Sequence, residues 1–180
     1  MPNLGKLGEQ VVAAWLRTQG WVILHHRWHC RWGEIDLIAC SGTGEWENSI
    51  ASFETNQRLN LRCTRSPAHP LPPSPLLVFI EVKTRSRGNW DADGLLAITP
   101  TKQAKLWRTA ELFLCEHPDL ENLPCRFDVA LVRCQRMSGR SHPDSAPDTI
   151  LQLPPVQLGQ PVLVAGYRII LQDYIESAFG

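Results

Sequence analysis

The sequence predicts a mixed α/β fold, in which helices pack on a sheet that contains a β-hairpin. Three segments carry this prediction: residues 4–19 and 99–115 repeat apolar side chains at the helical period, and residues 76–84, LLVFIEVKT, are typical of a buried strand. Because helical and strand patterns alternate along the chain, a sheet covered by helices is the expected architecture. The predicted order is α-β-β-β-α-β, followed by a β-rich end.

The composition is typical of a globular protein and excludes several classes. The 180 residues are 43% hydrophobic and 20% charged, and 18 Lys and Arg balance 18 Asp and Glu. This balance excludes a histone-like nucleic-acid binder but not a local basic patch. Lys6 and Glu9 interrupt the start, where a signal peptide needs an apolar stretch, and no apolar run is long enough to cross a membrane. We therefore expect a cytoplasmic protein with reduced cysteines and no membrane partner.

The first predicted helix covers residues 4–19 and ends at Gly20. Its apolar side chains share one stripe: Leu4, Leu7, Val11, Ala14 and Trp15. Residues 21–27 then form an apolar, partly β-branched run, a polar turn follows, and residues 34–40 alternate, so we expect a β-hairpin. With regular alternation, one side of its second strand carries Glu34, Asp36 and Ile38, and the other carries Ile35, Leu37 and Ala39.

Residues 41–76 interrupt this pattern, with five prolines between Pro67 and Pro75. A long loop without structure of its own is unusual inside a compact domain. We therefore interpret the segment as an insertion between two strands of a single domain, residues 1–180. The strand over 76–84 follows it.

The second half of the chain begins with a polar loop, after which Thr99 and Pro100 fit the N-cap and first position of a helix that ends near Cys115. Residues 127–132 are another buried strand, in which Asp128 is expected to pair with Arg126 rather than to hold a metal. A polar linker over 135–149 then precedes a β-rich C-terminal extension with two apolar segments, 150–153 and 162–171.

Ionisable side chains stand out in two of the predicted strands. Burying a charge without a partner is costly, yet the strand over 76–84 contains Glu81 and Lys83. Their spacing of two residues places both on one face of that strand. Asp36 breaks the apolar pattern of the hairpin strand in the same way. If the two strands pair, the carboxylates of Asp36 and Glu81 converge beside the Lys83 ammonium group.

Two carboxylates with open water positions suit Mg²⁺ or Mn²⁺ better than zinc. Such an ion can polarise a phosphodiester, and Lys83 can orient or deprotonate the attacking water or stabilise the transition state. Glu9, at the border of the first helix's apolar stripe, is a candidate third carboxylate, and the Val82 carbonyl is a further candidate ligand. The residues also fit a structural interpretation, in which Glu81 pairs with Lys83 and Asp36 forms a salt bridge at a sheet edge.

Four short motifs occur in order along the chain: GE at 8–9, RWGEIDLI at 31–38, VFIEVKTR at 78–85 and RFDV at 126–129. Together they resemble the YraN-like family, over residues 4–40 and 76–133 and a terminal segment at 176–179. That family is uncharacterised, and its fold is similar to that of the restriction-endonuclease-like PD-(D/E)XK nucleases, including archaeal Holliday-junction resolvases. Residues 41–76 and 135–165 depart from the compact family pattern, so nothing is carried over there.

The resemblance implies a restriction-endonuclease-like mixed sheet with a long inserted loop. It also implies a metal-dependent endonuclease that hydrolyses DNA phosphodiesters in branched or single-stranded DNA processing. Asp36, Glu81 and Lys83 are then the expected catalytic residues, and Asp36, Glu81 and Glu9 the expected ligands of Mg²⁺ or Mn²⁺. DNA is the expected partner, with a helicase or recombination protein and a second copy of the chain as further candidates. The alternative is a non-catalytic DNA- or partner-binding module that retains the nuclease fold.

Basic side chains near the motif are candidates for DNA contacts. Arg85 and Arg87 follow the strand directly and could contact phosphates, the alternative being a solvated loop. Lys102 lies at the start of the second helix, where a phosphate could meet the helix N-terminus. At the hairpin, Trp28 and Trp32 alternate with arginines, a mix that could stack on bases, although half-buried hairpin aromatics are the commoner case.

Overall fold

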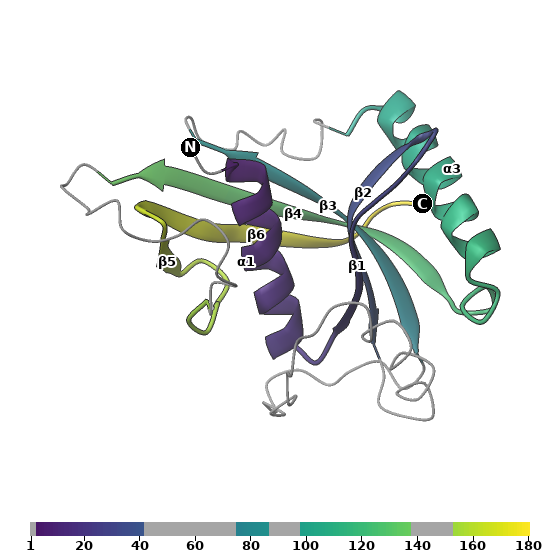
Figure 1. Ribbon diagram of the computed structural model, residues 1–180, viewed down its shortest axis with the longest axis horizontal. Helices are drawn as coiled ribbons and strands as arrows, with labels where there is room; N and C mark the ends of the chain where they lie inside the picture. Colours follow the sequence, from purple (N-terminus) through teal and green to yellow (C-terminus); the bar gives the residue numbers. More distant parts are fainter. Residues whose placement is uncertain (1–2, 42–74, 87–97, 138–152) are drawn as a thin grey trace.

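The computed structural model describes residues 3–41, 75–86, 98–137 and 153–180 (Figure 1). They form two helices and one six-stranded mixed sheet with the order β1-β2-β3-β4-β6-β5, which confirms the predicted α/β fold. β3 and β4 are parallel, and all other neighbouring strands are antiparallel. The elements are α1 (Leu4–Thr18), β1 (Val22–Cys30), β2 (Gly33–Ser41), β3 (Leu76–Arg85), α3 (Pro100–Glu116), β4 (Cys125–Arg136), β5 (Pro161–Val164) and β6 (Tyr167–Phe179).

Some of the predictions concern residues outside this description, namely most of the insertion over 41–76, the greater part of the linker over 135–149, and Arg87. The ends of the insertion are described. Ser41 and Leu76 are register partners in β2 and β3, and the Ser41 hydroxyl accepts a hydrogen bond from the Leu76 N–H at 3.1 Å. The insertion therefore leaves and rejoins the sheet at neighbouring positions of two paired strands.

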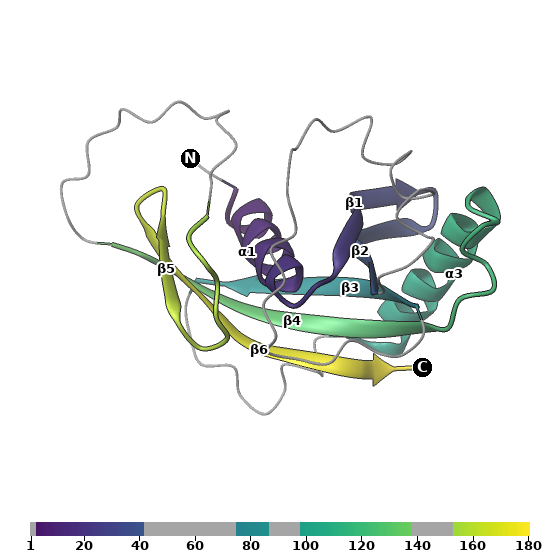
Figure 2. The ribbon, with the colours of Figure 1, turned by 90° about the horizontal axis from the view of Figure 1, so that it is seen from below.

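α1 forms because its sequence combines an N-cap with one apolar face. The Asn3 side chain accepts a hydrogen bond from the Lys6 N–H, and Gly20, with a φ of 85°, follows the helix end. The buried face, which includes Val12 and Leu16, packs on one face of the sheet (Figure 2). The predicted first helix is thus confirmed.

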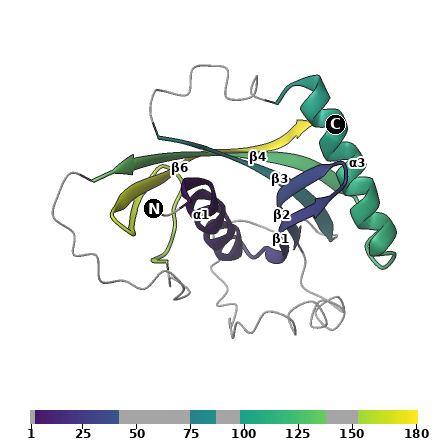
Figure 3. The ribbon, with the colours of Figure 1, turned by 45° about the horizontal axis from the view of Figure 1, so that its top comes forward.

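α3 covers the opposite face of the sheet and has the predicted start. The Thr99 hydroxyl accepts a hydrogen bond from the Lys102 N–H at 3.3 Å, and Pro100 is the first helical residue. Phe113 of α3 meets Phe79 of β3 with ring centroids 5.9 Å apart. Figure 3 shows the β1–β2 hairpin between the two helices. Neither helix in the described part of the chain is both long and apolar enough to cross a membrane.

The β1–β2 hairpin is confirmed, but its second strand does not alternate regularly. Ile35 and Ile38 both belong to the core under α3, whereas Leu37 belongs to the core under α1. The prediction that Ile35 and Leu37 share a side is therefore wrong. On β1, Arg27 lies opposite Asp36, between the register pairs His26↔Leu37 and Trp28↔Ile35, and adopts a φ of 53°. A residue in the left-handed region interrupts the pleat, so the irregularity of β1 at Arg27 faces the point at which β2 changes side.

The apolar segment over 162–171 contains a turn that its composition did not reveal. Ala165 and Gly166 have φ values of 51° and 79° and join β5 to β6, as in a two-residue hairpin turn. β6 then continues to Phe179 and pairs with β4, so the β-rich C-terminal part belongs to the main sheet. The C-terminus consequently lies next to α3 (Figure 1).

Candidate active site

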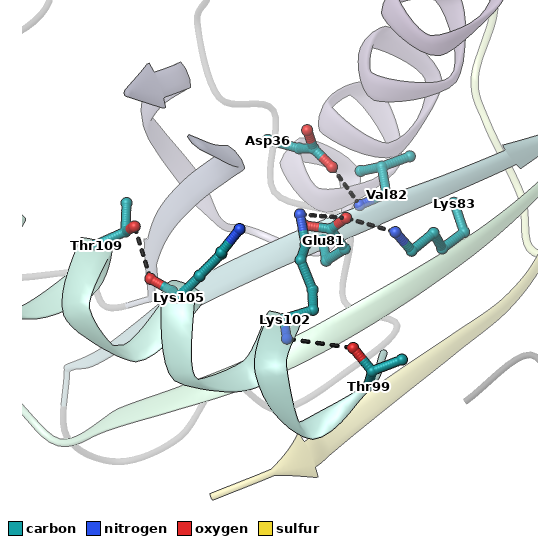
Figure 4. A network of polar contacts seen from close by, with 8 residues as sticks. All are labelled: Asp36, Glu81, Val82, Lys83, Thr99, Lys102, Lys105 and Thr109. Atoms are coloured by element: carbon teal, nitrogen blue, oxygen red, sulfur yellow. Dashed lines mark hydrogen bonds and ion pairs between the residues drawn. The ribbon is translucent and has the colours of Figure 1, made fainter. Parts of the chain in front are cut away.

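β2 and β3 separate beyond the register pair Leu37↔Ile80, and two carboxylates lie at this point. The Val82 N–H donates to Asp36 Oδ2 at 2.7 Å instead of to a backbone carbonyl of β2 (Figure 4). The Asp36 side chain therefore replaces a sheet hydrogen bond where the strands part. The same opening places Asp36 within electrostatic influence of Glu81.

Glu81 is a buried carboxylate whose two oxygens have different surroundings. The residue is 5% exposed, and its side chain lies on the α3 side of β3, in line with Leu77 and Phe79. Oε1 accepts a hydrogen bond from Lys83 Nζ at 2.7 Å and lies 3.2 Å from Lys102 Nζ. Oε2 is buried without a hydrogen-bond partner among the described residues. Since an unsatisfied buried polar atom costs free energy, a further ligand at Oε2 would be stabilising.

Asp36 is a carboxyl group that binds its proton unusually tightly. Burial, followed by the nearby Glu81 carboxylate, raises the pKa of Asp36 to about 7, although the hydrogen bond from Val82 opposes the shift. The ionised form of such a carboxyl group is stabilised by a positively charged partner. A divalent cation that displaces the proton would supply that partner.

The donor chemistry of this opening fits a hard cation such as Mg²⁺. Asp36 and Glu81 contribute carboxylate oxygens, and Glu81 Oε2 is the buried acceptor that still needs a partner. Mg²⁺ usually takes one or two carboxylates and keeps several waters. Within the described ranges no group of three His, Cys, Asp or Glu side chains lies close enough to hold a metal ion, so Glu9 does not complete a three-ligand cluster here.

Glu9 nevertheless lies close to the two carboxylates. It is buried on α1, its Oε2 is 3.9 Å from Arg27 Nε, and burial raises its pKa, with Glu81 among the smaller causes. Gly8 permits this approach, because a Cβ on it would lie only 2.1 Å from Thr84 Oγ1 of β3. The assignment of Glu9 as a third ligand stays a prediction.

The basic residues expected near DNA take different positions. Lys102 contacts Glu81, a pairing that sequence reasoning missed because it depends on how α3 packs against β3. Arg85 ends β3 and is exposed, while Arg87 lies outside the described residues. The structure thus brings two ammonium groups, those of Lys83 and Lys102, to one carboxylate oxygen. The DNA contacts of Arg85, Arg87 and Lys102 stay predictions.

Asp128 is a further buried carboxylate, and its oxygens are satisfied within the protein. It is 0% exposed and, as predicted, pairs with Arg126, whose Nε lies 3.0 Å from Oδ1. The Tyr174 hydroxyl donates to Oδ2 at 2.8 Å, and the Ser177 N–H donates to Oδ1 at 2.9 Å. These bonds fasten β6 to β4 at an irregular point of their pairing. Asp128 therefore has a structural role.

Comparison with known proteins finds relatives over nearly the whole chain. A model described as "Uncharacterised protein family UPF0102" matches residues 8–132, which include Glu9, Asp36, Glu81 and Lys83. The chain is 47% identical over 180 residues to a UPF0102 protein of Trichodesmium erythraeum, covering 98% of this chain and 88% of the relative. It is 47% identical over 177 residues to one of Acaryochloris marina, covering 98% and 90%. It is 38% identical over 181 residues to one of Synechocystis sp., covering 100% and 99%.

Proposed function

This chain belongs to the YraN-like uncharacterised protein family UPF0102, and we propose that it is a metal-dependent endonuclease that hydrolyses phosphodiester bonds in DNA. The observation that carries the proposal is the Glu81 carboxylate, which has ammonium groups at Oε1 and a buried, unsatisfied Oε2 at the opening that also holds Asp36. If Glu81 served only in a structural ion pair through Oε1, its buried Oε2 would remain without a partner, whereas a divalent cation would bind this oxygen.

Asp36 and Glu81 would hold Mg²⁺ or Mn²⁺, with Glu9 assisting from α1. The bound ion would polarise the scissile phosphodiester and neutralise charge that develops on the leaving oxygen. The protein keeps Asp36 in place through the Val82 N–H, so the first ligand is positioned before any ion arrives. The two ligands come from neighbouring strands, which are rigid elements for a catalytic site.

Lys83 supplies the chain's own positive charge for the chemistry. Its ammonium group lies 2.7 Å from Glu81 Oε1 and therefore beside the proposed ion site. Such a group can orient or deprotonate the attacking water, or stabilise negative charge on the phosphoryl oxygens in the transition state. Lys102 adds a second positive charge at the same carboxylate, which favours the approach of a phosphate.

The experiment compares wild type with Asp36→Asn and Glu81→Gln. Mg²⁺ and Mn²⁺ binding are measured by calorimetry without DNA, and cleavage is measured on a four-way junction and on single-stranded DNA. We expect both variants to keep their circular dichroism spectra and to lose metal-dependent cleavage, because each loses a charged oxygen ligand with little change in volume. Asp119→Asn, at an exposed carboxylate outside the site, is the matched control. Full cleavage by both site variants would refute the proposal.

A non-catalytic DNA- or partner-binding module is the second candidate. It is favoured by the absence of a three-ligand cluster in the described part of the chain, since two carboxylates hold an ion less tightly than three. This alternative expects DNA binding that Mg²⁺ leaves unchanged, with no ion bound and no cleavage. A purely structural role for Asp36, Glu81 and Lys83 expects affinity for neither metal nor DNA.

A further inference from the structure

A second distinctive surface lies at the turn of the β1–β2 hairpin, beside α3. Trp32 is 40% exposed at this turn. The guanidinium carbons of Arg31 and Arg108 each lie 5.1 Å from the centre of a ring of its indole. Lys105, which is exposed and three residues before Arg108 on α3, adds a third positive charge. We refer to these four residues as the Trp32 surface.

Packing holds this surface in a defined place. The Trp32 N–H donates to Cys30 Sγ at 3.3 Å, and the Cys30 thiol lies 3.8 Å from Thr109 Oγ1 on α3. Gly33 also lies against α3, since a Cβ on it would lie 3.2 Å from Thr109 Oγ1. The turn is therefore held against α3, and little conformational entropy is lost at Trp32 when it binds a ligand.

α3 connects the Trp32 surface with the candidate active site. Lys102 contacts Glu81, and Lys105 and Arg108 follow it at intervals of three residues, so neighbouring turns of the helix carry the three cations. Lys102 and Arg108 are six positions apart, which is about 9 Å of helix rise. Figure 4 shows Lys105 extending from α3 toward the side on which Asp36 and Glu81 lie.

Acidic neighbours do not neutralise these charges. Among the described residues, Arg31, Lys105 and Arg108 form no ion pair. Glu34, the acidic residue that follows the turn, pairs with Arg27 instead. Two guanidinium groups over one exposed indole, with Lys105 one helical turn from Arg108, match a ligand that combines phosphates with an aromatic ring. An apolar protein surface would leave the three charges without partners.

We propose that the Trp32 surface binds an unpaired nucleotide of DNA, with its base on the indole and its phosphates on the arginines. This inference rests on the proposed nuclease function and names its substrate class, namely DNA with a single-stranded segment. In a duplex, neighbouring bases cover each base face, so only an unpaired base can stack on Trp32. As the base arrives, an arginine exchanges its contact with the ring for a charge-assisted hydrogen bond to phosphate. α3 then carries the strand toward Lys102 and Glu81.

The test compares the binding of a fluorescein-labelled single-stranded thymidine 12-mer with that of a 12-base-pair duplex, with Ca²⁺ replacing Mg²⁺ so that cleavage does not interfere. We expect Trp32→Leu to weaken single-strand binding about 5- to 100-fold, the range for losing one base–aromatic stack, and to change duplex binding less than about twofold. Trp32→Phe keeps a ring and should stay within about threefold of wild type for both ligands. Trp107→Leu changes a second exposed tryptophan, which lies on α3; it is the matched control and should alter neither affinity.

The outcomes separate this inference from the proposed function. Loss of single-strand affinity in Trp32→Leu, but not in Trp32→Phe, supports the inference even if wild type cleaves no DNA. Equal weakening of single-strand and duplex binding would overturn it, because the contact would then be to the backbone alone. Unchanged binding in Trp32→Leu would also overturn it, while metal-dependent cleavage lost in Asp36→Asn would still support the nuclease. If Trp32→Leu fails to fold, the quenching of tryptophan fluorescence by the 12-mer is compared between wild type and Trp32→Phe. Quenching in wild type that is lost in Trp32→Phe would support stacking on Trp32. Equal quenching in both proteins would refute it.

Discussion

Replacing Asp36 by asparagine is expected to stabilise the metal-free protein at high pH and to abolish its stabilisation by Mg²⁺. The asparagine amide oxygen can still accept the hydrogen bond from Val82, so the opening between β2 and β3 keeps its support. The change removes the negative charge that burial and Glu81 disfavour. It also removes a ligand of the proposed ion.

The sign and magnitude of the effect follow from the pKa of Asp36. The folded protein raises that pKa to about 7, whereas an unfolded chain has an aspartate pKa of about 3.9. The contribution of Asp36 is therefore fully present below about pH 3.9 and is lost as the pH rises through about 7. A shift of about three units corresponds to at most about 4 kcal/mol. Because the side chain is only partly buried and solvent screens it, we expect about 1–2 kcal/mol between pH 5.5 and 8.5.

The assay is thermal denaturation in EDTA at pH 5.5, 7.0 and 8.5, repeated with Mg²⁺. For a chain of this size, about 1–2 kcal/mol changes Tm by roughly 3–6 °C. As the pH rises in EDTA, the Tm of wild type should fall by this amount more than the Tm of Asp36→Asn. Mg²⁺ should restore the lost stability in wild type but not in the variant. Asp119→Asn should follow wild type. Identical pH profiles for wild type and Asp36→Asn, or equal stabilisation of both by Mg²⁺, would refute the reasoning.

Three further predictions concern other parts of the chain. Lys83→Met should lower the single-turnover cleavage rate on the order of 10²-fold or more, because an electrostatic stabiliser of the transition state is lost. DNA affinity and its salt slope should change little, because at most one of several phosphate contacts is removed. Normal cleavage with poor binding would contradict the catalytic role. Gly8→Ala should lower the free energy of unfolding by about 1–3 kcal/mol in urea, because its Cβ meets Thr84 Oγ1 at 2.1 Å, and Thr84→Ala in the same chain should recover part of the loss. Replacing residues 44–73 by a short Gly/Ser linker should leave Tm within a few degrees, since the flanking Ser41 and Leu76 are register partners, and loss of folding would show that the segment packs on the core.

Most of the elements, and the residues of the candidate site, could be predicted from the amino-acid sequence. Apolar periodicity located both helices, because a helix that covers a sheet must bury one stripe. Asp36, Glu81 and Lys83 were recognisable because an ionisable side chain within a buried strand needs a partner. The N-cap at Thr99 and the pairing of Asp128 with Arg126 were also predictable, since both depend on residues close together in the chain.

What surrounds those residues could be seen only once the elements were packed together. β2 changes side at Asp36, opposite Arg27 with its φ of 53°, and the residue pattern of β2 records neither this irregularity nor the backbone angle on the neighbouring strand. The contact of Lys102 with Glu81 depends on how α3 is positioned over β3, which a local sequence pattern does not specify. The exposure of Trp32 likewise depends on where the hairpin turn meets α3. Periodicity along one element reports which of its faces is buried, whereas distances between elements are set by the packing of the whole core.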